Sequence, residues 1–375
     1  MHIEKTPYDC SGCSLCESQC PVSALHMKED KLGFLYPMID YEKCIDCGLC
    51  VKSCSFDKKY ISKLNYQSQF YGGRSYCKDV LSKSQSGGIG YEIAREALDN
   101  NYIVYGAAYD QDLSVKHIRV NSFSDLDRLQ GSKYIQSDLR PIWRLLLDDL
   151  KNGKSIVFFG TPCQVSAVRR IKELYRYDKL LLVDLICRGV PSQKLWKDYL
   201  DLLEKNNGTT VLKPNLRDKR FGWRSHIESY EFANGKIIEY PNKFYTPLYF
   251  RMSCSQCPFC NIHRVGDITI GDLWNVENIE STSRFLDNKG VSSIIINTIK
   301  GASFFEQLKP NIEFVKLKQS DINQEQLKCP VKLQPDRIKF ESLYDKKGFY
   351  AAIRRFGYLS WKYRIKKIAR YLLKK

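Results

Sequence analysis

Eight cysteines near the start of the chain have a spacing that suits iron–sulfur chemistry. The first four are separated by two, two and three residues and followed by Pro21, and the same spacing returns at residues 44–54 with Ser55 in the place of the proline. In such a run the first three thiolates bind one cubane cluster, whereas the fourth thiolate binds the other cluster. The sequence therefore predicts two [4Fe–4S] clusters, one held by Cys10, Cys13, Cys16 and Cys54, and the other by Cys44, Cys47, Cys50 and Cys20.

A pair of structural zinc sites is the alternative for these eight cysteines. Thiolates suit both zinc and iron–sulfur clusters, but three cysteines in so tight a loop match tetrahedral zinc poorly, and the doubled spacing is specific for cubanes. Proline is not a ligand, so Ser55 leaves the prediction unchanged. Because neighbouring clusters carry single electrons, we expect the rest of the chain to hold an electron store or a substrate site.

The length and the amino-acid composition favour a packed protein of two or three domains that stays in the cytoplasm. The chain has 375 residues, of which 43% are hydrophobic, with 15 cysteines and a formal net charge of +17. It contains no apolar run long enough for a membrane span, and its first residues lack the apolar stretch of a signal peptide. Cytosolic thiols are kept reduced, so these cysteines indicate metal binding and not disulfides.

The elements that must position the cysteines follow from the pattern of apolar residues. Helices are predicted over 87–98, 139–150 (capped by Asp138), 162–174 and 192–203, and strands over 102–109, 155–159 and 180–186. Residues 61–85 resemble a linker, and strands beyond residue 208 are shorter, most clearly 268–270 and 293–297. Alternating strands and helices indicate a parallel sheet covered by helices.

The predicted fold class is therefore a multidomain α+β and α/β protein. It has an N-terminal 2[4Fe–4S] ferredoxin fold, an α/β domain with a largely parallel or mixed sheet, and a basic C-terminal helix. The predicted domains are residues 1–60 for the ferredoxin, 61–150 and 151–330 for the two parts of the α/β region, and 335–375 for the basic tail.

A second group of cysteines lies in this α/β region. Cys163 follows one predicted strand and Cys187 follows the next, and consecutive parallel strands end at the same edge of a sheet, where ligands bind. A loop with Cys254, Cys257 and Cys260 is long enough to close over that edge. The alternative is a small zinc site made by this loop and His263. Cys77 and Cys329 are isolated, and we expect them to be ordinary thiols.

At these residues the chain resembles the coenzyme F420 hydrogenase and dehydrogenase beta subunit family of iron–sulfur flavoproteins. The likeness rests on six segments in the family's order, namely residues 86–88, 131–134, 160–164, 187–192, 254–257 and 266–272. The resemblance implies FAD in the second domain and a third [4Fe–4S] cluster beside it. The implied ligands are Cys163, Cys187, Cys254 and Cys257, with Cys260 an additional cysteine beyond the family's pattern.

A flavin would need donors for its phosphates and a surface for its ring. Ser86, Gly87 and Gly88 open a predicted helix, whose N-terminus favours anions. Lys133 and Tyr134 would add charge and stacking, and Thr161 lies at a strand-end turn. No GxGxxG fingerprint follows a strand, so the flavin is not expected to bind in the Rossmann manner.

Two basic residues are the predicted catalytic groups, because an anionic substrate or a reduced flavin needs a cation. They are Arg188, which adjoins Cys187, and Lys133. The single histidines His117, His226 and His263 are expected to be structural. The roles of Asp267 and Asp272 stay open.

The last forty residues hold more than half of the net charge. Residues 335–375 contain thirteen Lys and Arg against three acidic residues, a balance of +10. Trp361, Ile365, Ile368 and Leu372 recur at helical spacing among lysines, which is typical of a cationic helix at an anionic membrane surface. The alternative is a helix that packs its apolar stripe on the protein.

The function that follows is that of an oxidoreductase. Electrons would pass between a ferredoxin-like or flavin-linked partner, the clusters and FAD, to or from a small organic substrate. The resemblance implies a substrate like coenzyme F420 or a polysaccharide-pathway intermediate. A non-catalytic electron-transfer subunit that docks on a partner enzyme is the alternative. A zinc-containing nucleic-acid binder is disfavoured, because the charge is concentrated in the tail; no nucleic-acid partner is expected.

Overall fold

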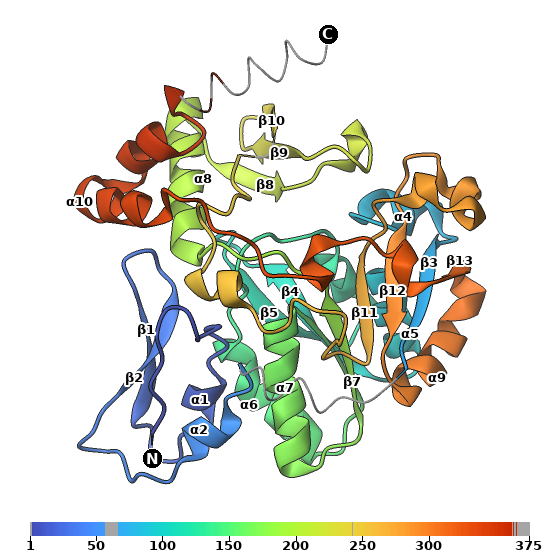
Figure 1. Ribbon diagram of the computed structural model, residues 1–375, viewed down its shortest axis with the longest axis horizontal. Helices are drawn as coiled ribbons and strands as arrows, with labels where there is room; N and C mark the ends of the chain where they lie inside the picture. The colour runs from blue at the N-terminus through green and yellow to red at the C-terminus, as the bar shows by residue number, and fades with distance from the viewer. Residues whose placement is uncertain (1, 57–66, 242, 362, 364, 366–375) are drawn as a thin grey trace.

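One large mixed sheet lies at the centre of the molecule, with a cysteine-rich module on one side and a smaller sheet above it (Figure 1). The computed structural model describes residues 2–56, 67–241, 243–361, 363 and 365. The predicted multidomain α/β class is confirmed, and the ferredoxin-like region has a small core of its own, made by Ile3, Cys16, Leu25 and Met27.

The cysteine-rich module contains two short helices and one hairpin. Its elements are α1 (Leu15–Ser18), β1 (Leu25–Glu29), β2 (Leu35–Ile39) and α2 (Leu49–Ser53). Each helix is preceded by a left-handed residue, Ser14 with φ 62° and Gly48 with φ 70°. The duplicated cysteine spacing is therefore matched by a duplicated local fold, in which a tight left-handed turn starts each helix.

The central sheet has eight strands in the order β13-β3-β12-β11-β7-β6-β4-β5. The strands are β3 (Gln69–Ser75), β4 (Ile103–Tyr109), β5 (Val115–Val120), β6 (Ile156–Gly160), β7 (Leu180–Leu185), β11 (Ile268–Asp272), β12 (Ser292–Ile296) and β13 (Ile312–Leu317). The four middle strands β11, β7, β6 and β4 are parallel, and the pairings at both ends are antiparallel. Both predicted parts of the α/β region supply strands, so they form one sheet.

Apolar side chains alternate between the two faces of this sheet, and helices cover both faces. Tyr105 and Phe158 face a core shared with Trp143 and Val168, whereas Val104 and its neighbours face a core on the other side. The covering helices are α4 (Lys78–Lys83), α5 (Ile89–Asp99), α6 (Trp143–Lys151), α7 (Pro162–Tyr175) and α9 (Ile299–Leu308).

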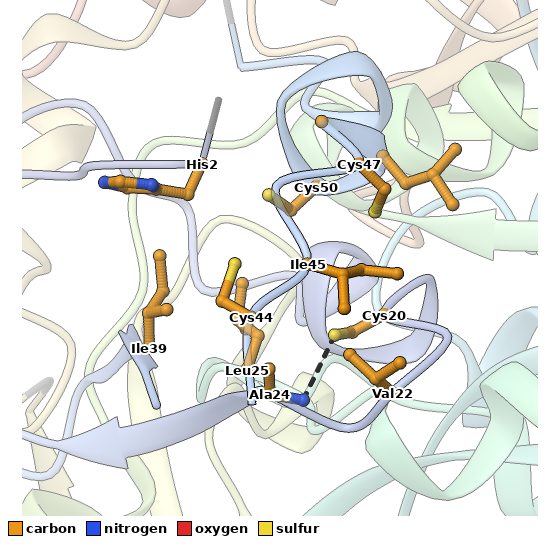
Figure 2. A pocket seen from close by; sticks show the side chains of 12 residues that line it. His2, Cys20, Val22, Ala24, Leu25, Ile39, Cys44, Ile45, Cys47 and Cys50 are labelled. Atoms are coloured by element: carbon orange, nitrogen blue, oxygen red, sulfur yellow. Dashed lines mark hydrogen bonds between the residues drawn. The ribbon is translucent and has the colours of Figure 1, made fainter. Parts of the chain in front are cut away.

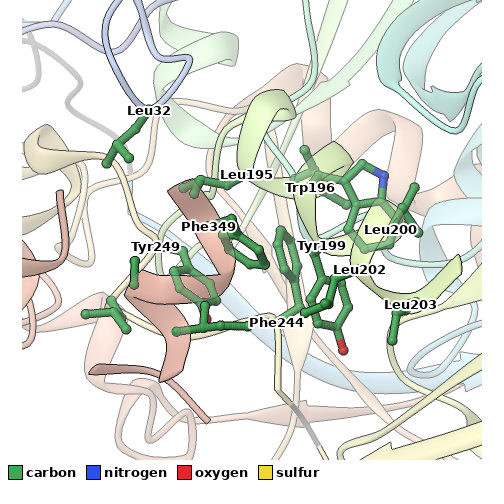
Figure 3. Close-up of a cluster of buried hydrophobic side chains, with 14 of the residues drawn as sticks. Leu32, Leu195, Trp196, Tyr199, Leu200, Leu202, Leu203, Phe244, Tyr249 and Phe349 are labelled. Carbon is green, nitrogen blue, oxygen red and sulfur yellow. The ribbon is translucent and has the colours of Figure 1, made fainter. Parts of the chain in front are cut away.

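The smaller region encloses an aromatic core (Figure 3). Its elements are α8 (Gln193–Asn207), β8 (Val211–Asn215), β9 (Ile227–Phe232), β10 (Ile237–Pro241) and α10 (Arg337–Phe356). Trp196, Tyr199 and Phe244 pack with Phe349 of α10, and Leu32 of the cysteine-rich hairpin joins the same cluster. This core therefore ties the first and last parts of the chain together.

The structure corrects two of the element predictions. Residues 61–85 are not simply a linker, because β3 lies in the middle of the antiparallel half of the sheet and α4 follows it. An added Cβ at Gly72 of β3 would lie 2.9 Å from Leu273 Cδ2, so close packing explains this glycine. The helix expected from residue 139 begins as a 3-10 turn at Arg140, whose backbone N–H donates to Asp138 Oδ1 at 2.9 Å, so Asp138 does bond to the start of the helix.

Nine 3-10 helices occur in the described part of the chain. They are η1 (Phe123–Leu129), η2 (Arg140–Ile142), η3 (Lys219–Phe221), η4 (Met252–Gln256), η5 (Val276–Asn278), η6 (Glu280–Phe285), η7 (Lys309–Asn311), η8 (Gln319–Asp321) and η9 (Glu325–Leu327).

The first half of the predicted basic tail belongs to the folded core. Phe340 and Phe349 of α10 are buried in the aromatic cluster, so this stretch follows the alternative prediction of a helix packed on the protein. Trp361 and Ile365 are exposed. Ile368, Leu372 and all of the basic residues of the predicted membrane-surface helix lie outside the described residues.

Candidate redox site

Four cysteines line one cavity in the cysteine-rich module (Figure 2). Cys44, Cys47 and Cys50 come from the second cysteine run, and Cys20 reaches the cavity from the end of the first run. The Ala24 N–H donates to Cys20 Sγ at 3.2 Å. The rest of the lining is largely apolar. The cavity thus gathers the four residues that the spacing predicts for one cubane, including the cysteine that crosses over.

The other four cysteines of the module lie close to one another. Burial, and then the thiolates of Cys54 and Cys10, raise the pKa of Cys13 to about 12. Burial also raises the pKa of Cys16, and the neighbouring Cys13, Cys10 and Cys54 raise it further. Thiolates packed together in this way repel one another unless cations separate them, which the iron atoms of a cluster would do. The four cysteines predicted for the other cubane are therefore neighbours.

A third set of cysteines converges at the carboxyl edge of the central sheet. Cys163 lies in the first turn of α7, directly after β6, and Cys187 follows β7. Burial and the neighbouring Cys257 raise the pKa of Cys163 to about 11, and burial followed by Cys254 raises that of Cys187. The four residues implied as ligands of a third cluster are therefore neighbours.

Cys260 and Thr161 adjoin this third set. Cys260 is buried and lies against Cys257, whose pKa is raised by the Cys260 thiol and by burial. Thr161 Oγ1 lies 3.2 Å from Cys163 Sγ, and the same side chain caps α7 in a capping box with Gln164. Thr161 therefore contacts the cysteine site and starts the helix that carries Cys163.

A buried ion pair anchors the cysteine loop to the sheet. Arg264 Nη2 lies 2.5 Å from Asp184 Oδ2 on β7, and neither side chain is more than 1% exposed. Arg264 Nη1 also donates to the Phe259 carbonyl at 2.7 Å. Since Phe259 lies between Cys257 and Cys260, the ion pair holds that part of the loop against the strand whose end carries Cys187.

Three side chains of the α/β region donate to the backbone of the first cysteine loop. Arg251 Nε donates to the Cys10 carbonyl at 2.7 Å, Gln136 Nε2 to the Ser11 carbonyl at 2.8 Å, and Trp143 Nε1 to the Cys13 carbonyl at 3.1 Å. The set with Cys10 thus faces the α/β region. Exposed Cys47 belongs to the set that lies toward the surface.

Most residues predicted to bind flavin phosphates are engaged within the protein. The Ser86 hydroxyl donates to the Val291 carbonyl at 2.9 Å, and the Gly87 N–H donates to Ser292 Oγ at 3.0 Å. Gly88 stands before α5 with φ 79°. These contacts join the loop to the sheet, so the donors of Ser86 and Gly87 do not face an empty phosphate site.

Lys133, predicted as catalytic, holds its own loop. Its Nζ donates to the carbonyls of Arg128 and Gln130, both at 2.9 Å, and burial lowers its pKa to about 7. The geometry therefore supports a structural role for Lys133.

Tyr134 and Arg188 do lie near the third cysteine set. The ring of Tyr134 packs on that of Tyr245 with centroids 4.4 Å apart, and the Tyr245 hydroxyl donates to the Gly189 carbonyl. Burial raises the pKa of Tyr245, as does Cys187, while the charge of Arg188 opposes the rise. Arg188 is itself exposed. Two aromatic rings and one cation thus stand beside Cys187.

Sequence reasoning missed a cationic and aromatic cluster next to Tyr134. Arg217 Nη1 lies 2.8 Å from Asp272 Oδ2, and its guanidinium lies 4.7 Å from the centroid of Trp274. Trp223 stacks on Trp274 and donates to Asp272 Oδ1 at 2.8 Å. Arg217 Nε is buried and has no hydrogen-bond partner among the described residues. The feature of the sequence that could have indicated this cluster was Asp272, to which the sequence analysis assigns no role.

Lys219 lies beneath the loop predicted to hold phosphates. Its Nζ donates to the carbonyls of Leu81, Ser84 and Ser86, at 2.5, 2.9 and 2.8 Å. Burial lowers its pKa to about 8. No spacing in the sequence marked this residue, because its partners are backbone atoms more than 130 positions away.

The remaining polar candidates are structural or isolated. His117 is buried between Ser137 and the Phe159 carbonyl, and burial lowers its pKa to about 4. Asp267 accepts from the Leu182 N–H in the sheet. His226 and His263 are exposed. The isolated cysteines are exposed as well, at Cys77 and Cys329.

Two kinds of feature are missing from the described residues. They contain no group of three or more His, Cys, Asp or Glu side chains placed to hold a metal ion. Within the same residues no helix is long and apolar enough to cross a membrane. Support for the clusters therefore rests on the cysteine spacing and on the three sets of neighbouring cysteines.

Comparison with known proteins gives two family matches and several relatives. Residues 9–58 match a 4Fe-4S dicluster domain, and residues 153–320 match the C terminus of the coenzyme F420 hydrogenase/dehydrogenase beta subunit. An F(420)H(2) dehydrogenase subunit of Methanosarcina mazei is 23% identical over 325 residues, which are 82% of this chain and 84% of that protein.

Other similarities are shorter or more distant. One subunit of the Na(+)-translocating ferredoxin:NAD(+) oxidoreductase complex of Acetobacterium woodii is 43% identical over 47 residues, only 12% of this chain and 13% of that protein. A chain of the xenon-derivatised F420-reducing [NiFe] hydrogenase complex from Methanosarcina barkeri covers 74% of this chain and 90% of its own length. Its identity is 20% and its TM-score 0.48, too low to support an argument.

The matches agree with the two cysteine-rich parts of the structure. The dicluster match covers the module with the first two sets, and the longer match begins just before β6 and includes all four cysteines of the third set. The protein is thus an iron–sulfur electron-transfer protein related to the coenzyme F420 hydrogenase/dehydrogenase beta subunits, whose C-terminal part its residues 153–320 match, with a 4Fe-4S dicluster domain in front of them.

Proposed function

We propose that this protein is an iron–sulfur flavoprotein oxidoreductase with three [4Fe–4S] clusters and FAD. It passes electrons between a ferredoxin-like or flavin-linked partner and a small organic substrate. The observation that carries the proposal is the convergence of Cys163, Cys187, Cys254 and Cys257. These cysteines lie at the sheet edge where α/β proteins bind ligands. This is the side of the α/β region that contacts the first cysteine loop, through Arg251 and the Cys10 carbonyl.

In this proposal the cysteines would bind the clusters, and other side chains of the α/β region would bind the flavin. Each set of four thiolates fits one cubane. Bound FAD supplies the exchange between hydride and single-electron chemistry. Tyr134 and Tyr245 offer ring faces near Cys187, and the unpaired Arg217 Nε offers a buried donor for an anionic group. Arg188 stands at the exposed side of this site, where it would attract an anionic substrate.

The residues proposed for FAD differ in part from those expected from the sequence. Gly88, Tyr134 and Thr161 stay in the proposed site, because nothing in their contacts excludes them. Ser86, Gly87 and Lys133 would support it indirectly, since their polar groups hold the surrounding loops.

A second candidate is an electron-transfer subunit without a substrate of its own. The relative from M. mazei is named as a subunit of an F(420)H(2) dehydrogenase, which favours a partner protein for this chain as well. Mixing the purified protein with reduced coenzyme F420 distinguishes the two. Bleaching of a bound flavin without any added protein supports the enzyme, and bleaching that needs a partner supports the subunit.

Anaerobic purification with iron, sulfide and flavin counts tests the main proposal. About twelve irons and one FAD per chain are expected, at about four irons per cubane. About eight irons would remove the third cluster, and a protein with zinc and no iron would overturn the proposal.

We also propose that the end of the chain binds the cytoplasmic membrane surface. Deleting residues 335–375 would remove Phe340 and Phe349 from the core, so the better variant ends after Ser360, which keeps Tyr358 and Leu359 packed on that core. Co-sedimentation with anionic liposomes should fall strongly in that variant. Equal pelleting of both proteins would contradict membrane binding.

A further inference from the structure

One buried arginine joins the first cysteine loop to the third cysteine set. Arg251 is 1% exposed and precedes the 3-10 helix that carries Cys254. Besides its bond to the Cys10 carbonyl, its Nη2 donates to the Leu35 carbonyl at 2.6 Å, and its Nη1 donates to Gln136 Oε1 at 3.3 Å. The same guanidinium therefore forms hydrogen bonds to both the first cysteine loop and the hairpin of the cysteine-rich module.

The space around Arg251 is shaped to accept it. The guanidinium carbon lies 4.4 Å from the ring centroid of Tyr36 and 5.4 Å from that of Phe34. Gly12 of the cluster loop has φ 67°, and an added Cβ there would lie 2.6 Å from Arg251 Nη1. A side chain at residue 12 would thus displace the arginine.

No ion pair joins Arg251 to a carboxylate among the described residues, and its contacts are carbonyls, one amide and two ring faces. A buried charge without a counter-ion is costly. Thiolate-bound cubanes carry net negative charge, which grows when they take up an electron. Two cubanes beside Arg251 would supply the missing counter-charge.

Arg251 is close to both cysteine sets. Its side chain donates to the Cys10 carbonyl, and its own carbonyl accepts from the Cys254 N–H at 3.1 Å. Its charge opposes the rise in the pKa of the Cys254 and Cys163 thiols that burial causes. We propose that Arg251 is a positioning residue that fixes the spacing between the Cys10 and Cys254 cluster sites and raises the reduction potential of both. This inference rests on the proposed function, because it requires both clusters.

The test compares reduction potentials in the full-length holoprotein by EPR-monitored redox titration. Arg251→Met keeps the length and apolar stem but loses the charge. We expect the reduction equilibria of both adjacent clusters to become at least tenfold less favourable, which is about 59 mV for a one-electron couple. The cluster at Cys20, Cys44, Cys47 and Cys50 is the internal control and should keep its potential.

Two further variants separate charge from packing. Arg251→Lys keeps the charge and should stay within a few-fold of the wild type, whereas Trp143→Phe removes an uncharged bond to the same loop and should leave the potentials unchanged. If Arg251→Met loses its iron, Arg251→Gln takes its place, because it keeps one hydrogen bond without the charge.

The outcomes are distinct. Unchanged potentials in iron-replete Arg251→Met or Arg251→Gln overturn the inference, as does an equal drop in Trp143→Phe or Arg251→Lys. A wild-type protein that lacks the third cluster refutes instead the proposed function on which the inference rests.

Discussion

Loss of the buried ion pair behind the cysteine loop should remove the third cluster and spare the other two. Asp184→Asn keeps the size of the side chain and retains an oxygen that can accept from Thr269, but it leaves the Arg264 charge without a counter-ion. Arg264 would then strain the contact to Phe259 that seats the loop between Cys257 and Cys260.

The size of the effect follows from how deeply the pair is buried. Removing one partner of a buried pair costs about 3–5 kcal/mol, because the other charge stays desolvated. Side-chain exposures of 1% for Arg264 and 0% for Asp184 place this pair in that class. Since about 1.4 kcal/mol is tenfold, the balance between a seated and a released loop shifts by about 100- to 4,000-fold. That is sufficient for cluster loss during purification.

The assay is an iron and sulfide count on anaerobically purified protein, together with EPR of the reduced clusters. Asp184→Asn should retain about eight irons where the wild type holds about twelve. Asp149→Asn is the matched control, because it breaks the 2.7 Å ion pair between Arg119 of β5 and Asp149 of α6, away from the third cysteine set. A full iron complement in Asp184→Asn, with unchanged thermal stability, would refute the anchoring role.

Three other predictions concern single residues. Burial raises the pKa of Glu228 from 4.5 to about 7, so its contribution to stability is complete below pH 4.5 and falls by about 3 kcal/mol as the pH rises to 7. Glu228→Gln should remove this fall. Thermal melts of both proteins at pH 5 and pH 8 measure it, and a difference in Tm between the two proteins that is the same at both pH values would contradict the prediction. Cys260→Ser should keep about twelve irons while Cys254→Ser loses about four; a loss of about four irons in Cys260→Ser as well would show that Cys260 is a ligand. Gly87→Ala places a Cβ 2.4 Å from the Gly73 carbonyl and should lower stability by about 1–3 kcal/mol, measured as a lower Tm; an unchanged Tm would show that the strand can shift.

The sequence was most informative where chemistry depends on spacing along the chain. The doubled cysteine motif predicted which residues meet, and the cavity around Cys20 and Cys44 contains that set. The strand-end argument placed Cys163 and Cys187 at one sheet edge, and β6 and β7 are indeed adjacent and parallel. Both predictions worked because local geometry, a tight loop or a βα turn, fixes where the side chain goes.

The sequence was less informative where a residue's contacts are with distant parts of the chain. Ser86 and Gly87 looked like donors for a phosphate, yet their partners come from the segment at Val291 and Ser292, which is more than 200 positions away. Lys219 likewise holds carbonyls of the preceding loop. Glycine and serine at a helix start have the same composition whether they bind an anion or a neighbouring strand, so spacing cannot separate the two.

The way the cysteine-rich module is attached explains why it belongs to this protein and is not simply a carrier joined by a linker. Its inner loop is bound by side chains of the α/β region, and its hairpin contributes Leu32 to the aromatic core shared with α10. A carrier that must leave to meet its partner would not bury its inner cluster loop in this way. Since Cys47, in the outer set, is exposed, a partner protein would meet the module on that side. The fixed order is then outer set, inner set and sheet-edge set, and the charge of Arg251 lies between the last two.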